Sequence, residues 1–267
     1  MPEFTNDGVK IYYEIEGKGP PVLLIHGFSS SMEYNWKQQG WLDALKDNFK
    51  VILIDCRGHG KSDKPHDKAF YGQRMQDDVV KLLEHLSIEK ANLFGYSMGA
   101  LITYSLLLRK PEIFISAILG GFVLTFREDE KARNDFREII KRRIGAFKAD
   151  TIEQVKDPMA RQFREYAEMR GNDLLALAAV EGGTLEQFET AASPDQIKDS
   201  LKKIDVPVLT VVGSNEAIAG DKTLIAQLVP NACHFQIQGK DHLTVVSDPK
   251  FHMVVNAFLD YINIKKD

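Results

Sequence analysis

Residues 93–100 read LFGYSMGA, a short apolar run that leads into a serine with a glycine two positions before it and another two positions after it. The residues before Gly95 are typical of a buried strand, and those after Gly99 are typical of a helix. Ser97 therefore falls where a strand should turn sharply into a helix. Two interpretations are open here: a tight turn without chemistry, or a nucleophile held on a strained corner.

The two glycines fit the second interpretation. Without side chains, Gly95 and Gly99 would let the strand and the helix pass closely, and the serine could adopt the strained torsions of the turn. The backbone N–H of Met98 would then lie at the beginning of a helix, facing developing negative charge. The pattern Gly-x-Ser-x-Gly is weak on its own and needs support from the rest of the chain.

Strand and helix signals alternate on both sides of this corner. Continuous apolar runs that end in glycine are typical of strands covered on both faces, and an alternating run is typical of an outer strand. The apolar runs are 21–27 and 51–58, and 92–97 and 115–121 repeat the pattern; the alternating run is 9–17. Strand signals return at 206–213 and 233–239. Helical spacing occurs at 36–48, 72–86, 98–109 and 249–264. This order predicts an α/β fold with right-handed crossovers and a mainly parallel sheet.

The alternation stops between residues 122 and 204, where no convincing strand occurs. Phe136, Ile140 and Phe147 share one helical face, and Phe163 and Tyr166 indicate another helix. The simplest account is an α/β core interrupted by a helical insertion. Because ligands bind at the carboxyl ends of parallel strands, an insertion that leaves and re-enters there would cover the site.

The overall composition excludes several classes of partner. The chain has 267 residues, 44% of them hydrophobic and 27% charged, with a formal net charge of −4. That balance gives no reason to expect nucleic acid or an anionic membrane as a partner. The N-terminus has no apolar run of signal-peptide length, and no stretch approaches the ~20 apolar residues of a membrane span. We expect a cytoplasmic protein.

Cysteine and histidine usage predicts no metal and no disulfide framework. Cys56 and Cys233 are too few for either a disulfide scaffold or a structural zinc site. The seven histidines are scattered and show no metal-ligand spacing. No cofactor is therefore expected.

A serine nucleophile needs a base, and His242 is placed best among the histidines. It follows the strand 233–239 and precedes the last helix, so it should lie at the same sheet edge as Ser97. His26 also ends a strand, but its neighbour Gly27 suggests an oxyanion turn, and we interpret His26 as a packing or supporting group. We interpret His59 as a turn residue and assign surface or core positions to the others, which are His66, His85, His234 and His252.

The histidine in turn needs an acid, and the loop after strand 206–213 offers two. Glu216 lies three residues past the glycine that ends the strand and is favoured. Asp221 is the alternative, although it lies where a helix should begin and could cap that helix. Asp241 is adjacent to His242 in sequence, so its side chain is poorly placed to bond that ring.

Five segments together resemble the α/β-hydrolase family. They are HGF (26–28), DCRGHGKS (55–62), GYSMGA (95–100), the acid loop after VVG, and GKDH (239–242) with Pro249. The resemblance implies an eight-stranded sheet, a core formed by 1–121 and 205–267, and a helical cap at 122–204. It also implies the chain order nucleophile, acid, histidine.

Carried over residue by residue, the resemblance makes Ser97 the nucleophile and His242 the base. The backbone amides of Phe28 and Met98 would form the oxyanion hole, and the DCRG segment would be a structural turn. The sequence departs from the family pattern twice. Glu216 stands where the family usually has aspartate, and Asp241 stands where it usually has glycine.

A serine at the nucleophile position restricts the reaction. Relatives that open epoxides or displace halide use a carboxylate, which forms an ester that water can cleave, whereas serine would give an ether. Acyl chemistry remains, so we expect a cofactor-free serine hydrolase that acts on small carboxylic esters. Lactone hydrolysis, hydrolysis of carbon–carbon bonds in diketone-like acids, acyl transfer and haloperoxidase activity are alternatives on the same site.

A different class of function also stays open, because the same fold hosts ligand receptors with little turnover.

The apolar residues of the insertion suggest an acyl pocket; they are Phe122, Leu124, Phe126, Phe136, Phe147, Phe163 and Tyr166. The run from Arg127 to Lys148 has eight basic and five acidic residues. That run is either a solvated helix face or a patch that binds a substrate carboxylate. Neither the natural substrate nor the oligomeric state can be predicted.

Overall fold

One eight-stranded sheet runs through the protein, with the strand order β1-β2-β4-β3-β5-β6-β7-β8. The computed structural model describes residues 2–126, 129–218 and 220–264. The strands are β1 (Glu3–Asn6), β2 (Val9–Glu16), β3 (Pro21–Ile25), β4 (Lys50–Ile54), β5 (Ala91–Tyr96), β6 (Phe114–Gly120), β7 (Val208–Gly213) and β8 (Ala232–Ile237). The β1–β2 and β2–β4 pairs are antiparallel and all the others are parallel. This arrangement confirms the predicted α/β fold with a mostly parallel sheet.

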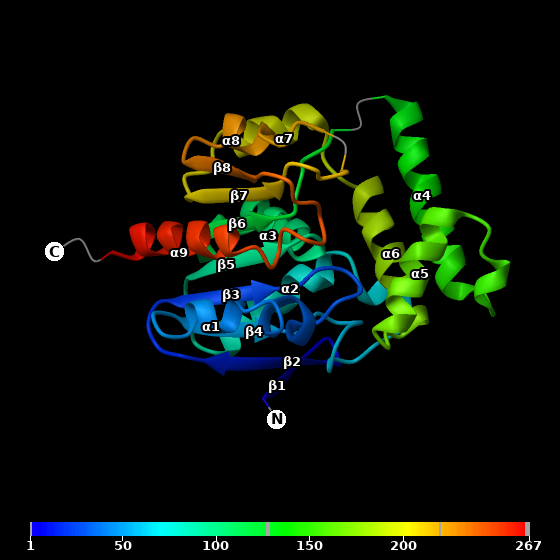
Figure 1. Ribbon diagram of the computed structural model, residues 1–267, viewed down its shortest axis with the longest axis horizontal. Helices are drawn as coiled ribbons and strands as arrows, with labels where there is room; N and C mark the ends of the chain where they lie inside the picture. Colours follow the sequence, from blue (N-terminus) through cyan, green and yellow to red (C-terminus); the bar gives the residue numbers. More distant parts are fainter. Residues whose placement is uncertain (1, 127–128, 219, 265–267) are drawn as a thin grey trace.

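Helices cover both faces of the sheet (Figure 1). One face packs against α2 (Gln73–His85), α3 (Met98–Arg109) and α8 (Leu224–Leu228), and the other packs against α1 (Trp41–Leu45) and α9 (Pro249–Asn263). Consecutive strand residues serve opposite layers, since Leu93 belongs to the first hydrophobic cluster and Phe94 to the second. Burial on both faces explains why the central strands β3, β4, β5, β6 and β7 are apolar nearly throughout, whereas the outer strand β8 is partly exposed.

The structure differs from the prediction of one helix over 36–48. A π-helix at Glu33–Lys37 (η1) is followed by the short α1, and Gly40 lies between them with φ of 79°. Glycine adopts this left-handed conformation without steric cost, so the chain can turn there. The break lets Trp36 and Trp41 both pack on Phe94, at ring-centroid distances of 4.8 Å.

Four helices lie between β6 and β7: α4 (Glu130–Lys148), α5 (Pro158–Met169), α6 (Leu174–Glu189) and α7 (Pro194–Leu201), with a short turn, η4 (Ile152–Gln154). Each begins at a residue whose side chain accepts a hydrogen bond from the helix N-terminus, namely Asp129, Asp157, Asp173 and Ser193. Figure 1 shows α4, α5 and α6 beyond the ends to which the parallel strands point, whereas α7 lies beside α8. The division into a core and a cap at 122–204 stays a prediction.

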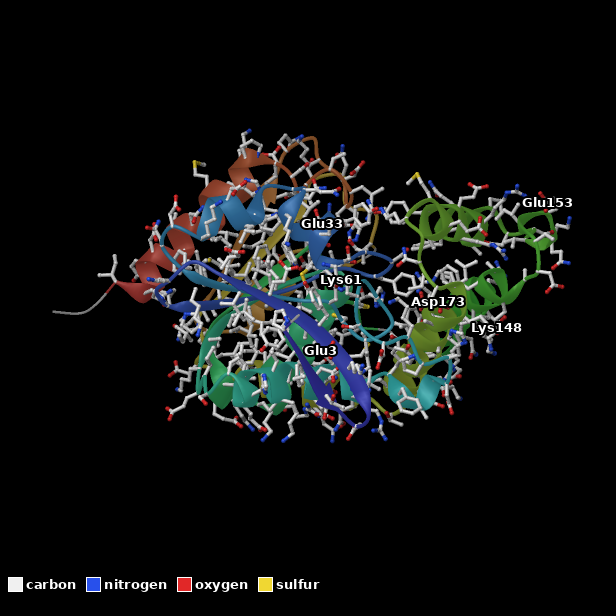
Figure 2. All side chains as sticks on the ribbon, turned by 90° about the horizontal axis from the view of Figure 1, so that it is seen from below. Glu3, Glu33, Lys61, Lys148, Glu153 and Asp173 are labelled. Atoms are coloured by element: carbon white, nitrogen blue, oxygen red, sulfur yellow. The ribbon has the colours of Figure 1, made fainter. Side chains whose placement is uncertain are left out.

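Polar contacts attach α4–α6 to the rest of the protein. Asn172 donates to both the carbonyl and the hydroxyl oxygen of Ser29, at 3.3 Å each. His66 Nε2 donates to Asp173 Oδ2 at 3.0 Å. Figure 2 shows Asp173 on the side of these helices that faces the sheet, with Lys148 and Glu153 on the far side. The segment between α5 and α6 is therefore held against the loop that follows β3.

Within the described ranges, no helix combines the length and the apolar character that crossing a bilayer requires.

Candidate active site

Three loops at the carboxyl edge of the sheet bring together three side chains that the sequence singled out. Ser97 follows β5, Glu216 follows β7 and His242 follows β8. Nε2 of His242 lies 2.9 Å from the hydroxyl oxygen of Ser97, and Nδ1 lies 2.8 Å from Oε2 of Glu216. A carboxylate can only accept a hydrogen bond, so Nδ1 carries the ring proton and Nε2 is free to accept the serine proton.

The serine stands on a strained corner. Ser97 has φ of 54° and ψ of −110°, outside the regions that side chains with a Cβ normally adopt. A Cβ added at Gly95 would overlap the carbonyl of Gly99, and one added at Gly99 would overlap the carbonyl of Ile25. Only glycine fits at these two positions, so the motif is required by the close approach of β3, β5 and α3.

Two backbone amides next to the serine are available to a ligand. Among the described residues, neither Phe28 nor Met98 donates its N–H to a backbone acceptor. Met98 is the first residue of α3, where helical N–H groups have no partner within the helix. The side chain of Asn35 accepts the N–H of Gly27 at 3.0 Å and so fixes the loop that presents Phe28.

The acid of the constellation is largely buried. The side chain of Glu216 is 1% exposed, and its Oε1 accepts the N–H of Ile218 at 3.2 Å. Burial alone would raise the pKa of this carboxyl group. The pKa of Glu216 is nevertheless lowered from its ordinary value. The hydrogen bond from His242 and the positive charge of its protonated ring stabilise the carboxylate, and so do the backbone N–H groups of Ala217 and Ile218; together they outweigh burial. The site therefore holds a carboxylate against the imidazole.

The other two acids have local roles. Asp221 accepts hydrogen bonds from the backbone and side chain of Thr223 and from Gln227, which closes the turn before α8. Asp241 accepts from the backbone of Leu243 and Thr244 and so shapes the turn that carries His242. The positive φ of this loop is at Gly239, which has φ of 77°, and not at Asp241.

His26 and His59 lie behind the oxyanion loop. Nδ1 of His26 donates to the carbonyl of Gly27 at 2.8 Å, and Nε2 accepts the N–H of Cys56 at 3.0 Å. Burial lowers the pKa of His26, and burial together with His26 lowers the pKa of His59 to about 3. The neutral imidazole of His26 therefore ties the loop after β3 to the loop after β4, and the neutral ring of His59 packs against it at a centroid distance of 5.2 Å.

Sequence reasoning missed two residues that position the site. The hydroxyl of Tyr96 donates to the carbonyl of His242 at 2.5 Å, and Asn35 holds Gly27 as described above. The position of Tyr96 directly before the nucleophile was the available signal, because that residue must point away from the serine at the end of β5. No pattern in the sequence indicated Asn35.

Of the apolar residues predicted to form an acyl pocket, two pack next to the oxyanion loop. Phe147 and Phe163 belong to one hydrophobic cluster with Phe28, and the rings of Phe28 and Phe147 are 5.9 Å apart. Phe136 packs instead on Phe188, at 4.7 Å. In the part of the chain that the structure describes, no group of three His, Cys, Asp or Glu side chains is arranged to bind a metal ion.

Comparison with known proteins identifies relatives over nearly the whole chain. A family model described as the alpha/beta hydrolase fold matches residues 20–249. AB hydrolase superfamily protein YisY from Bacillus subtilis is 30% identical and covers 80% of this chain and 81% of its own. 3-Oxoadipate enol-lactonase 2 from Acinetobacter baylyi is 26% identical over 97% and 96% of the two chains. The enol-lactonase structure from Burkholderia xenovorans has a TM-score of 0.75 at 21% identity and covers 97% of this chain and 99% of its own.

Proposed function

This chain belongs to the α/β-hydrolase family, and we propose that it is a serine hydrolase that cleaves small carboxylic esters through an acyl-enzyme. The observation that carries the proposal is the hydrogen-bonded series from Ser97 through His242 to Glu216. The backbone amides of Phe28 and Met98 lie next to this series and have no backbone acceptor among the described residues. The backbone torsions of Ser97 are strained. A structural turn without chemistry needs none of these features.

In the first half of the reaction, the hydroxyl oxygen of Ser97 attacks the ester carbonyl while its proton moves to Nε2 of His242. The carbonyl oxygen becomes an oxyanion, and the amides of Phe28 and Met98 donate to it. The C–O bond to the alcohol then breaks. The departing alkoxide takes the proton from His242, which leaves an acyl group on Ser97.

Water completes the cycle in the second half. His242 removes a proton from water, and the resulting hydroxide attacks the acyl carbonyl. When the second tetrahedral intermediate collapses, Ser97 regains its proton and the acid leaves. Glu216 holds Nδ1–H throughout and stabilises the imidazolium. A general base contributes about 10²–10⁴-fold and one oxyanion donor about 3 kcal/mol, so these groups supply the reaction without a metal or an organic cofactor.

The surroundings of the oxyanion loop favour a compact acyl group. Phe28, Phe147 and Phe163 form an apolar cluster with Leu177 from α6. A short hydrocarbon chain leaving water for such a surface gains about 0.8 kcal/mol for each buried CH₂ group. The cluster supports small apolar acyl groups as substrates.

Lactones are a second candidate substrate, since a lactone is a cyclic ester. The relative from Acinetobacter baylyi, which matches 97% of this chain, is named as an enol-lactonase. Ring opening would use the same steps, except that the alcohol produced would remain attached to the acyl group until water releases the product.

The test is a panel of 4-nitrophenyl esters, lactones and diketones assayed with the purified protein and with the Ser97→Ala variant. We expect turnover of short esters that Ser97→Ala abolishes. Mass spectrometry of the protein after rapid quenching should show the acyl group on the peptide that contains Ser97.

Other outcomes would point elsewhere. Ligand binding without turnover would favour a receptor-like function, and cleavage confined to diketones would favour a carbon–carbon bond hydrolase. Turnover that survives in Ser97→Ala would refute the proposed nucleophile.

A further inference from the structure

Basic residues along α4 mostly have carboxylate partners at the surface. Lys131, Lys141 and Arg142 pair with exposed or half-exposed acids, as a solvated helix face does. This agrees with the first of the two interpretations of the run from Arg127 to Lys148, of which Arg127 and Glu128 lie outside the described residues. Arg143 is different, because its partner is buried.

Arg143 and Glu181 form an ion pair between α4 and α6 in which the carboxylate is buried and the arginine side chain is 20% exposed. The Nη2 atom of Arg143 lies 2.8 Å from Oε1 and 2.9 Å from Oε2 of Glu181, and Glu181 is only 4% exposed. The guanidinium carbon lies 4.8 Å from the ring centroid of Phe163. The cation is thus held by a carboxylate on one side and by an aromatic ring on the other.

One donor of this arginine is unsatisfied. The Nε atom of Arg143 is buried and has no acceptor among the described residues. A buried N–H without a partner costs about 1–3 kcal/mol, so such groups are rare unless a ligand or water completes them.

The pair lies on the side of α4 and α6 that faces the oxyanion loop. Leu177, Glu181 and Thr184 are spaced at i, i+4 and i+7 and therefore share one face of α6. Leu177 belongs to the cluster that contains Phe28, and Thr184 lines a small pocket together with Met98. Glu181 thus shares a face of α6 with two residues, one in the cluster of Phe28 and one that lines the same pocket as Met98.

The position of the arginine agrees with this placement. Arg143 precedes Phe147 by one helical turn on α4, and the ring of Phe147 contacts that of Phe28. An acyl group that is attached to Ser97 and extends past Phe28 along the apolar cluster would approach the unsatisfied Nε–H.

We propose that Arg143 is a specificity-determining residue whose Nε–H donates a hydrogen bond to an uncharged oxygen, a keto or hydroxyl group, on the acyl chain of the substrate. This inference rests on the proposed ester hydrolysis and narrows its substrate class to oxo- or hydroxyacyl esters and lactones.

The charge balance favours an uncharged acceptor over a second carboxylate. Glu181 already neutralises Arg143, so a substrate carboxylate would add a net negative charge beside a carboxylate that is almost fully buried. Burying an uncompensated charge is costly, whereas a neutral carbonyl or hydroxyl oxygen satisfies the N–H without that penalty.

The experiment compares kcat/KM for 4-nitrophenyl hexanoate, its 3-oxo, 4-oxo and 5-oxo analogues, and the 4-nitrophenyl monoester of adipic acid. We expect the wild-type protein to prefer at least one oxo analogue over hexanoate by about tenfold to a hundredfold, the range of one hydrogen bond to a charged donor. The wild-type protein should not prefer the adipate monoester over 4-nitrophenyl hexanoate.

Two variants test the residue. Arg143→Lys keeps a cation for Glu181 and lacks the Nε donor, and the double variant Arg143→Met with Glu181→Met removes both charges together. Each should bring the preference for the oxo analogue, measured as the ratio of its kcat/KM to that of hexanoate, close to one. Arg142→Lys is the matched control, because Arg142 is exposed and pairs with Asp157; it should keep the wild-type preference.

Equal rates for all the hexanoyl esters, a preference that survives in Arg143→Lys, or a preference for the adipate monoester would each overturn the inference and leave the proposed function standing. A wild-type protein that cleaves none of the esters would overturn both.

Discussion

The carboxylate of Glu216, whose side chain is almost fully buried, accepts the hydrogen bond of His242 Nδ1–H at 2.8 Å. Glu216→Gln keeps the shape of the side chain but lets the amide favour the wrong ring tautomer. We expect kcat for a 4-nitrophenyl ester to fall by about 10³–10⁴-fold. Asp221→Asn is the control, and it should leave kcat within a factor of two of wild type. Loss of activity in Asp221→Asn with full activity in Glu216→Gln would reverse the assignment.

Tyr96 supports the histidine loop through its hydroxyl group, which donates to the carbonyl of His242. Tyr96→Phe removes that hydrogen bond and leaves the ring in place. We expect kcat to fall about three- to tenfold with little change in KM, together with about 1 kcal/mol less stability to urea. Tyr104→Phe is a matched control, because the hydroxyl of Tyr104 is buried with no partner among the described residues. If both variants behave alike, the hydrogen bond does not position His242.

The corner that carries the serine should be intolerant of any side chain at Gly99. A methyl group there would overlap the Ile25 carbonyl, so Gly99→Ala should cost about 3 kcal/mol or more in unfolding free energy and abolish activity. Gly145 is the opposite case, because it is exposed on α4 and a methyl group there would meet only open space. Gly145→Ala should stabilise the protein by about 0.5–1 kcal/mol. Urea denaturation of both variants checks the contrast, and a fully stable, active Gly99→Ala would contradict it.

Stability should fall on acidification because of His59, whose pKa is lowered from 6.5 to about 3 by burial and by the nearby His26. Since the unfolded chain binds the proton more tightly, the contribution is fully present above pH 6.5 and is lost as the pH falls toward 3. Between about pH 3 and pH 6.5, the free energy of unfolding should fall by up to about 1.4 kcal/mol for each pH unit of acidification. Urea denaturation of the wild type and His59→Asn at several pH values measures it. The variant should show a shallower slope than the wild type, and equal slopes for the two proteins would contradict the prediction.

The fold was predictable because its signals are local. Runs such as those at 21–27 and 51–58 are apolar throughout since both faces of the sheet are covered, and Gly95 and Gly99 mark the one place where two backbones nearly touch. The positions of Ser97, Glu216 and His242 followed from the rule that parallel strands end at the same edge. The structure places these three side chains together; their catalytic roles stay predictions.

The parts that escaped prediction depend on tertiary contacts that no local sequence pattern shows. Tyr96 and His242 are 146 positions apart, and Gly27 and Asn35 meet through a loop whose π-helix has no recognisable pattern. The unsatisfied Nε of Arg143 is likewise visible only when α4 and α6 are packed together. Local propensity carries no information about such pairs.

The separation of 145 positions between Ser97 and His242 has a consequence for biosynthesis. The ribosome synthesises the segment around Ser97 long before it reaches His242. A nascent chain can therefore form most of its sheet before it contains the histidine. Because we propose His242 as the base, we expect turnover to begin only after β8 has docked at the border of the sheet. Enzyme assays of ribosome-stalled chains of increasing length would thus report the moment at which the last strand joins.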